Sequence, residues 1–534
     1  MQSLPLRHRL DFVCRTLHRM IHFGKWLVGC LLAALFLTGC ADKKTDGKEN
    51  ADSLTALTDP RRPKVQATCS SCHLFVEPGL LDKTTWAKSV LPGMGTRLGI
   101  FAHNGVHYTS DSGKINTDGI YPSQPVLTKE EWQKILDYFE TYAPVSVAPQ
   151  ARTQSYSVGL PMFQARTVGG NVSAPIISMV KTNPAGGYFF YDAGSGNLVQ
   201  MTKEGNKMAG GILPNPISCI TPYRNGFLVS KIGSMYPSDE WLGAITYLER
   251  SGNRLVEKET IRNKVERPVN LQTGDLDGDG TEDIVVCGFG NNKGDFYWLK
   301  KEGARWKKHS IRNVPGAISA RLTDFDKDGD LDIITLFAQG LEKLVLFTNN
   351  GKGEFTQKNL LEFPAVQGSS SFELDDFNKD GIQDVLYTCG DNADYSVVFK
   401  NYHGVYIFLG KADGSFTQNY FYPMNGAYKA MASDFDGDGD LDIAAISFFA
   451  DYVNQPFEGF LFFEQTKPLQ FSVRSHSATH SGRWLTMDVG DMDGDQDPDI
   501  VLGNFSYGPT SSPDSVNIKW QRGPVTMVLE NVAK

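Results

Sequence analysis

Hydrophobic and polar residues follow two different patterns along the chain, and the change falls near residue 150. Before it, segments 86–91 and 129–142 carry apolar residues at helical spacing. Beyond it, short runs rich in Val, Ile, Phe and Tyr, such as 226–229 and 344–347, are separated by Gly, Asn and Asp. The pattern predicts a small α-helical segment followed by a mainly β region.

The N-terminal residues have the pattern of an export signal. An apolar run over 26–37 follows basic residues and is too short to span a bilayer as a stable helix. The run ends in Leu-Thr-Gly-Cys at 37–40, which resembles the bacterial lipoprotein signal, in which the cysteine is lipidated and becomes the first mature residue. This resemblance implies a signal peptide over 1–39, lipid on Cys40 and a polar tether over 40–60. An ordinary cleavage site near Cys40 is the alternative.

Residues 69–73 contain two thiols spaced two apart and followed at once by a histidine. In covalent haem attachment, two such cysteines add across the vinyl groups and the histidine binds the iron. A redox dithiol or half a zinc site is the alternative, but no second cysteine pair lies nearby and an export signal lies upstream. We therefore expect one covalent haem c, held by Cys69, Cys72 and His73 in a small α-helical c-type cytochrome domain over 61–148.

The second axial ligand of this iron should come from between the two predicted helices. Met94 is the only methionine from His73 through the second helix, and a thioether there would raise the reduction potential relative to a second histidine. His103 and His107 are competing ligands, and a methionine that only fills the core is the structural alternative. We expect Met94 to be the ligand.

The remaining cysteines do not predict a disulfide framework. Of the eight cysteines, two lie in the signal peptide, one takes lipid and two take haem. Cys219, Cys287 and Cys389 are left, an odd number, and all lie in apolar segments. We expect these three to be buried free thiols.

An acidic motif recurs five times between residues 275 and 499, and this recurrence is more specific than any single copy. Each copy places oxygen-bearing side chains at positions 1, 3, 5 and 9 of a tight loop that precedes an apolar strand. These ligands suit a hard cation, with calcium the natural choice, while position 7 offers its carbonyl and glycine at position 6 permits the turn. The loops are not EF-hands, since no glutamate stands at position 12. The candidate metal ligands are Asp275, Asp277, Asp279, Asp283, Asp324, Asp326, Asp328, Asp332, Asp376, Asn378, Asp380, Asp384, Asp434, Asp436, Asp438, Asp442, Asp491, Asp493, Asp495 and Asp499.

The charge of the chain agrees with metal binding. The formal net charge is −9, and residues 1–39 carry a net +4, so the mature chain is near −13. Gln496 stands where the other loops have glycine, so we expect about four or five calcium ions to offset this acidity. The acidity therefore indicates metal binding more than a nucleic-acid partner or attraction to a membrane surface.

The spacing of the loops predicts a repeat architecture. Their first aspartates are 49, 52, 58 and 57 residues apart, which fits a four-stranded propeller blade with variable loops. If 168–214 and 215–264 form two metal-free blades, seven blades fit residues 160–534. Six or eight blades would also fit, and a stack of separate β-domains is the structural alternative.

The loops and the segments 351–355 and 414–416 resemble the FG-GAP/VCBS repeat family, whose integrin-type members are calcium-stapled β-propellers. The resemblance implies a propeller over 155–534, strongest over 270–510, and Gln496 departs from the family pattern. With its cytochrome-like front part, the chain resembles bacterial cell-envelope lipoproteins that join a small c-type cytochrome to such repeats.

These parts predict a membrane-anchored electron carrier rather than an enzyme, with haem supplying the chemistry and the protein supplying ligation and docking. We expect an exported lipoprotein of the cell envelope, facing the periplasm or the cell surface. The propeller face would dock a redox partner protein, another envelope component or a polysaccharide. No catalytic residue is assigned.

Two other classes of function stay open at this point. One is a propeller that holds its own organic cofactor and passes electrons to the haem, although the tryptophan-docking repeats of quinoprotein dehydrogenases are missing from the sequence. The other is a surface protein that binds or cleaves carbohydrate, in which Trp241, Trp484 and Trp520 could form a sugar platform. Its candidate acid/base and charged groups are His403, His476, His480, Arg483, Asp239, Glu240, Asp451 and Glu458.

Overall fold

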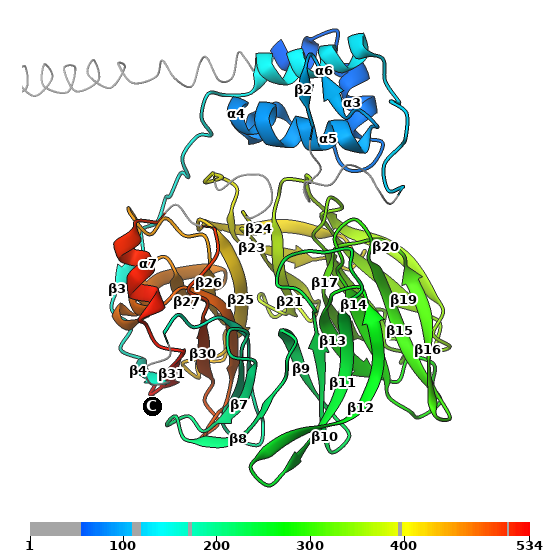
Figure 1. Cartoon of the computed structure of the whole chain (residues 1–534). Helices are drawn as coiled ribbons and strands as arrows, with labels where there is room; N and C mark the ends of the chain where they lie inside the picture. Colours follow the sequence, from blue (N-terminus) through cyan, green and yellow to red (C-terminus); the bar gives the residue numbers. More distant parts are fainter. Residues whose placement is uncertain (1–54, 109–118, 169–172, 393–397, 510–511, 534) are drawn as a thin grey trace, which may run out of the picture. The chain divides into compact units, whose positions relative to one another are not determined.

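The structure, a computed structural model, describes residues 55–108, 119–168, 173–392, 398–509 and 512–533 (Figure 1). The chain divides into two units, residues 1–64 and 65–534. The predicted signal peptide, the predicted lipid-attachment residue Cys40 and most of the predicted tether lie outside the described residues. Within the described ranges, no helix combines the length and the apolar composition that crossing a membrane requires.

Short helices precede the β region, and one of them has the predicted bounds. α6 (Lys129–Tyr142) begins where the Thr128 hydroxyl accepts the Glu131 N–H at 3.2 Å, while the Glu131 carboxylate accepts the Thr128 N–H at 3.0 Å. The predicted helix over 129–142 is confirmed, and the one predicted over 86–91 lies within a longer helical run. The other elements are α3 (Arg62–Cys69), η1 (Pro78–Leu80), α4 (Lys83–Thr85), the π-helical turn η2 (Trp86–Val90), α5 (Leu91–Arg97), and the hairpin of β1 (Ala102–His103) and β2 (Val106–His107).

The helical segment has an aromatic core of its own. Trp132, Ile135, Tyr138 and Phe139 form the buried face of α6. The helical spacing predicted Trp132, Ile135 and Phe139 on this face, whereas Leu136, which it also predicted there, is only half-buried. Trp86 packs on Phe139 with ring centroids 4.3 Å apart, and its indole N–H donates to the Pro78 carbonyl at 2.9 Å. The aromatic residues thereby fix η2 and α6 against each other.

Beyond residue 155 the chain is mainly β and forms antiparallel meanders in which consecutive strands pair. The first six meanders are β5 (Ile177–Thr182), β6 (Tyr188–Asp192), β7 (Asn197–Met201) and β8 (Lys207–Ile212); β9 (Ile217–Tyr223), β10 (Gly226–Lys231), β11 (Gly243–Ser251) and β12 (Arg254–Val265); β13 (Pro268–Gly274), β14 (Asp283–Gly288), β15 (Asp295–Glu302) and β16 (Arg305–Arg312); β17 (Ala317–Thr323), β18 (Asp332–Phe337), β19 (Lys343–Asn349) and β20 (Phe355–Glu362); β21 (Ser369–Asp375), β22 (Asp384–Cys389), β23 (Gly404–Gly410) and β24 (Phe416–Pro423); and β25 (Ala427–Ser433), β26 (Asp442–Ser447), β27 (Phe460–Lys467) and β28 (Gln470–Ser475). A last sheet contains β29 (Trp484–Gly490), β30 (Asp499–Asn504), β31 (Thr526–Asn531) and β4 (Phe163–Val168). Two short helices, η3 (Ser477–Ser481) and α7 (Asp514–Gln521), lie between strands of this C-terminal part, and β3 (Ser157–Val158) pairs parallel to β28.

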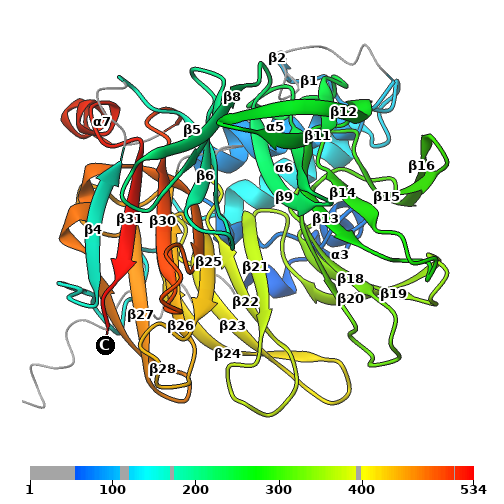
Figure 2. The same ribbon diagram turned by 90° about the horizontal axis from the view of Figure 1, so that it is seen from below.

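The first strands of these sheets contact one another in a closed circle. β5 contacts β9, the contacts continue through β13, β17, β21 and β25 to β29, and β29 contacts β5 again. Strand β4 comes from the start of the β region but pairs antiparallel to β31 near its end, with Phe163 opposite Asn531. Figure 2 shows β4 and β31 side by side. The two ends of the β region therefore share one sheet.

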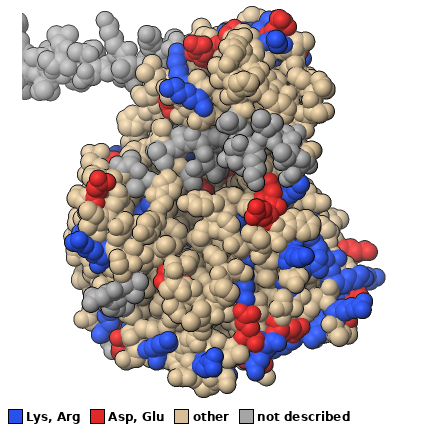
Figure 3. Space-filling view, viewed as in Figure 1, with Lys and Arg blue, Asp and Glu red and all other residues tan. Residues whose placement is uncertain are grey.

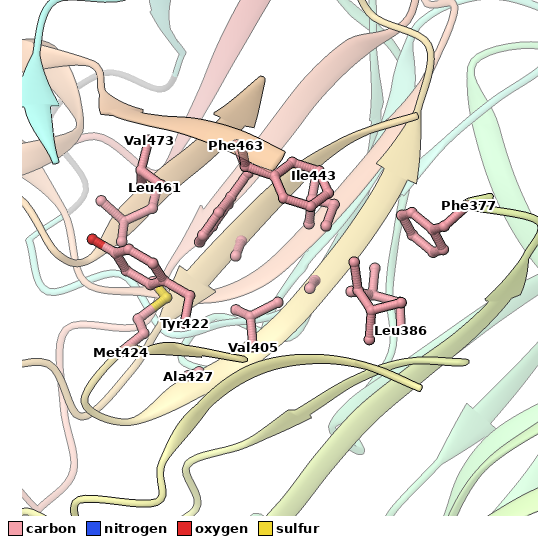
Figure 4. Packing of buried hydrophobic residues seen from close by; sticks show 14 residues of the cluster. Phe377, Leu386, Val405, Tyr422, Met424, Ala427, Ile443, Leu461, Phe463 and Val473 are labelled. Atoms are coloured by element: carbon pink, nitrogen blue, oxygen red, sulfur yellow. The ribbon is translucent and has the colours of Figure 1, made fainter. Parts of the chain in front are cut away.

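In each sheet that contains an acidic loop, the strand that follows the loop is buried along its whole length. All six residues of β14, β18, β22, β26 and β30 are buried, which explains their continuous apolar runs. Between two of these meanders, Phe377, Leu386, Ile443 and Phe463 belong to one apolar cluster (Figure 4). Packing between neighbouring sheets thus supplies the hydrophobic core of the β region.

The cysteine predictions are confirmed in part. Cys219, Cys287 and Cys389 are free thiols, and Cys287 and Cys389 are buried. Cys219, on β9, is only half-buried, although it packs against the apolar cluster between the second and third meanders.

A buried carboxylate joins the last sheet to the first. One oxygen of Asp488, on β29, accepts the backbone N–H of Thr182 at 2.8 Å and the Thr182 hydroxyl at 2.7 Å. The Lys181 ammonium lies 2.9 Å from the same carboxylate. Because Asp488 is 2% exposed, its charge depends on these donors from β5 for stabilisation.

We predict that Asp488→Asn lowers the free energy of unfolding by about 2 kcal/mol, since the amide removes the charge and cannot accept all of these bonds. Urea unfolding measures the change. Thr182→Val should cost about 1 kcal/mol, because it removes the hydroxyl bond alone. Glu140→Gln, an exposed substitution on α6, serves as the neutral control. Equal stabilities of wild type and Asp488→Asn would contradict the role of this carboxylate.

Candidate functional site

The two thiols of the Cys-x-x-Cys-His motif lie at the end of α3 and in the turn that follows it. Cys69 is the last residue of the helix, and the Ser70 N–H donates to the Gln66 carbonyl at 2.8 Å. Both Cys69 and Cys72 are free, with Cys69 half-buried and Cys72 exposed. Burial, together with the neighbouring Cys72, raises the pKa of the Cys69 thiol to about 11. The helix end therefore presents two reduced thiols close together.

The ring of His73 is oriented by the backbone next to it. Its Nδ1 lies 2.8 Å from the carbonyl oxygen of Leu74. Because a carbonyl can only accept, Nδ1 must carry the proton, and in the neutral ring Nε2 then keeps its lone pair. A hydrogen bond of this kind is what typically orients a metal-binding histidine.

The motif opens into an apolar cavity of about 480 Å³. This volume lies in the range of cofactor and ligand sites. Loop residues of the β region, among them Asn292, Gln339 and Lys400, complete its wall. The lining residues from the helical segment include Cys69, Cys72, His73, Trp86, Val90, Leu91, Met94, Leu98, Trp132, Ile135 and Phe139.

The cavity separates the three candidate axial ligands. Met94, half-buried on α5, lines the cavity together with His73. His103 is buried, its Nε2 lies 2.7 Å from the Gln133 side-chain oxygen, and it does not line the cavity. His107 is exposed on β2 and does not line it either. Of the three residues, only Met94 is placed where it could face a ligand bound to His73.

The acidic loops bring carboxylates together as the sequence predicted. In the loops at 275–283, 434–442 and 491–499, one oxygen from each of positions 1, 3 and 5 lies within 4.8 Å of the others. In the loop at 324–332 the close set is Asp324, Asp326 and Asp332. The loop at 376–384 has Asn378 at position 3, so its oxygens include an amide.

The first and ninth residues of each loop also shape its backbone. Asp275 accepts the N–H groups of Gly278 at 2.9 Å and Gly280 at 2.8 Å, and the first aspartate of each other loop likewise accepts the N–H of its own position 6. The ninth aspartates are buried at the start of the second strand and accept the N–H of position 2, as Asp283 does from Leu276 at 3.1 Å. The sequence predicted position 9 only as a ligand, but it is also the anchor of the loop.

Buried oxygens in these loops fit a hard cation. Burial, together with neighbouring carboxylates, raises the pKa of Asp283 and of Asp442 to about 7. One carboxylate oxygen each of Asp277, Asp440 and Asp497 is buried without a hydrogen-bond partner within the described residues. Asp440 and Asp497 are at position 7, where the sequence predicted only a carbonyl ligand. An aspartate at position 7 was the available signal.

Gln496 adopts the backbone conformation that glycine provides in the other loops. Its φ is +74°, compared with +82° for Gly280 and +89° for Gly439. This left-handed backbone conformation costs more free energy for glutamine, which has a Cβ atom, than for glycine, as the sequence led us to expect.

Two of the five loops already face a lysine. Lys300 pairs with Asp277 and lies 2.8 Å from Asp279, and Lys203 pairs with Asp493 and lies 2.8 Å from Glu530. Sequence spacing gave no signal for either contact, because each lysine lies on a strand or turn outside the loop it meets.

The acid/base candidates for carbohydrate cleavage mostly hold loops in place. His403 is buried, and desolvation together with Lys400 holds the pKa of its ring well below the usual value. The Arg483 guanidinium donates to backbone carbonyls, including Pro509 at 2.6 Å, and lies over the Phe448 ring. The other candidates behave similarly: Glu458 pairs with Arg152, Asp239 accepts the N–H of Asn292, Asp451 accepts that of Asn454, His476 accepts that of Ala478, His480 contacts Lys519, and Glu240 is exposed.

The three tryptophans do not form one surface. Trp484 is fully buried, and Trp520 is 1% exposed. Trp241 is 54% exposed, beside Leu242 at 52%. Trp484 and Trp520 are therefore packing residues, and a sugar platform made of all three is wrong.

Comparisons with known proteins concern the β region. The FG-GAP-like repeat model matches residues 275–335, which contain the first two acidic loops. No curated protein matches the sequence. Among solved structures, streptogramin B lyase is 11% identical over 69% of this chain and 97% of its own, with a TM-score of 0.42. BBS1N in complex with ARL6DN, soaked with lead, is 12% identical over 71% of this chain and 99% of its own, with a TM-score of 0.43.

The extracellular domain of the putative one component system BT4673 from B. thetaiotaomicron is 15% identical over 69% of this chain and 40% of its own, with a TM-score of 0.38. The chain therefore contains an FG-GAP-like repeat and is mainly β.

Proposed function

We propose that the chain is a c-type cytochrome with an electron-transfer role, anchored to the cell envelope through lipid on Cys40. The observation that carries the proposal is the apolar cavity that Cys69, Cys72, His73 and Met94 line together. A haem bound there would supply reversible one-electron chemistry.

The chain's own residues would hold and tune this cofactor. Cys69 and Cys72 would attach it covalently, and the Leu74 carbonyl would keep Nε2 of His73 directed to the iron. Met94 would be the second axial ligand, and the wall of Trp86, Trp132 and Phe139 among others would exclude water. Apolar walls and a thioether ligand both favour the reduced form and so raise the potential.

The β region would be a seven-bladed β-propeller. Six four-stranded meanders and one sheet completed by β4 support this number, as does the closed circle of contacts among the first strands. Full closure leaves only short, protected sheet edges, which suits a rigid docking platform.

Calcium would bind in the acidic loops and stabilise this platform. The close carboxylates, the unpaired buried oxygens and the raised pKa values of the ninth aspartates support a hard cation. An ion that binds the folded loop and not the unfolded chain adds its binding free energy to stability.

The propeller face would dock a redox partner protein or another envelope component. The carbohydrate-cleaving alternative has less support, because most of its candidate residues are buried or serve as loop anchors. A propeller-bound organic cofactor has no residue set that favours it among the described residues.

We predict that the protein matured with haem keeps the haem after denaturation and shows a low-spin reduced spectrum with a thioether charge-transfer band in the oxidised form. Met94→Ala should abolish that band and lower the reduction potential, because the iron loses its sulfur ligand. Visible spectroscopy and redox titration measure both effects.

Met162→Ala, at a half-buried methionine of the β region, is the matched control and should leave the spectrum unchanged. Cys69→Ser combined with Cys72→Ser should abolish covalent attachment, while Cys219→Ser should not. A purified wild type without covalent haem would sink the cytochrome proposal.

We also predict that calcium removal by a chelator lowers the thermal unfolding midpoint and that calcium restores it. Each site at a calcium concentration about 100 times its dissociation constant adds about 2.7 kcal/mol. Magnesium at the same concentration is the control ion, and Asp413→Asn, in a turn outside the loops, is the control variant. An unchanged midpoint in the chelator would count against calcium.

A further inference from the structure

The first acidic loop meets a lysine that the sequence motif does not contain. Lys300, on the neighbouring strand β15, pairs with Asp277 and lies 2.8 Å from Asp279. Its ammonium group therefore contacts the carboxylates at positions 3 and 5 of the loop. Its side chain is 23% exposed, so the pair is partly withdrawn from water. Figure 3 shows basic side chains beside acidic ones around β15 and β16.

The fifth loop meets a lysine from another sheet. Lys203 lies in the turn between β7 and β8 of the first meander, and it pairs with Asp493 of the fifth loop. The same ammonium lies 2.8 Å from Glu530 on β31. Its side chain is 16% exposed. Lys203 thus crosses the seam where the circle of sheets closes.

Within the described residues, the second, third and fourth acidic loops face no lysine of this kind. Across the described residues, no lysine or arginine nitrogen lies within 4.0 Å of a carboxylate of the loops at 324–332, 376–384 or 434–442. The five loops share the spacing of their ligand positions, and within the described residues the lysine contacts distinguish the first and fifth loops from the three middle ones. A divalent ion that enters the first or fifth loop must displace an ammonium group and then remain close to it. Repulsion between the two cations weakens binding there, and no such repulsion opposes binding in the middle loops.

We infer that Lys300 and Lys203 are tethered cations that replace calcium in the loops at 275–283 and 491–499, so that calcium binds only the three middle loops. The inference rests on the proposal that these loops bind calcium. Lys203 would then hold the first meander to the last sheet without a metal ion, because its ammonium group contacts both Asp493 and Glu530.

The test is the number of calcium ions bound by the intact folded chain, measured by equilibrium dialysis. Wild type should bind about three ions, and Lys300→Met should bind one more, because the freed carboxylates of Asp277 and Asp279 complete a calcium site. Lys203→Met should also gain a site. Lys301→Met removes the same charge from the next residue of β15 and should gain none.

Thermal unfolding is a second measurement, and it tests the inference even if these variants fold poorly without calcium. In chelator, Lys300→Met should unfold at a lower temperature than wild type, and excess calcium should remove this difference, whereas Lys301→Met should show no such rescue. About five ions in wild type with no gain in Lys300→Met would overturn the inference and leave the calcium proposal standing. No bound calcium in any variant would overturn both.

Discussion

Closure of the circle of sheets is the constraint on which the β region depends. The pairing of β4 with β31 lets a strand from the start of the region complete its last sheet. Asp488 then joins this last sheet to the first one by accepting hydrogen bonds from Thr182 on β5. A circle that closes leaves no long sheet edge exposed, and each buried second strand then packs against neighbours on both faces.

Charge is concentrated at the ends of these buried strands. The ninth aspartate of each acidic loop is nearly inaccessible and accepts backbone N–H groups, so it fixes where the loop ends and the strand begins. Asn349 adds a link between sheets, because its side chain donates to the Leu276 carbonyl of the preceding loop at 2.8 Å. Clustered carboxylates are costly without a counter-charge, and lysines supply one at the first and fifth loops. The carboxylates that cluster in the loops at 324–332 and 434–442 face no such lysine within the described residues.

The helical segment solves a different problem, that of placing a few ligands around an apolar space. The carbonyl of Leu74 sets the tautomer of His73, while the contact between Trp86 and Phe139 holds η2 against α6. Close packing helps here, since a Cβ on Gly95 would lie 2.7 Å from the Tyr108 ring. In the proposed cytochrome, these contacts would orient the ligands before the cofactor arrives.

The sequence by itself determined the local features: the helix over 129–142, the mainly β character, the recurrence of the acidic loops and the Cys-x-x-Cys-His motif. These depend on spacing of a few residues, so composition and periodicity suffice. Only the tertiary structure separated Met94 from His103, showed the anchoring role of the ninth aspartates and brought Lys203 and Lys300 to the loops. Each of those outcomes depends on which elements pack together, because residues distant in sequence meet only when the chain has closed.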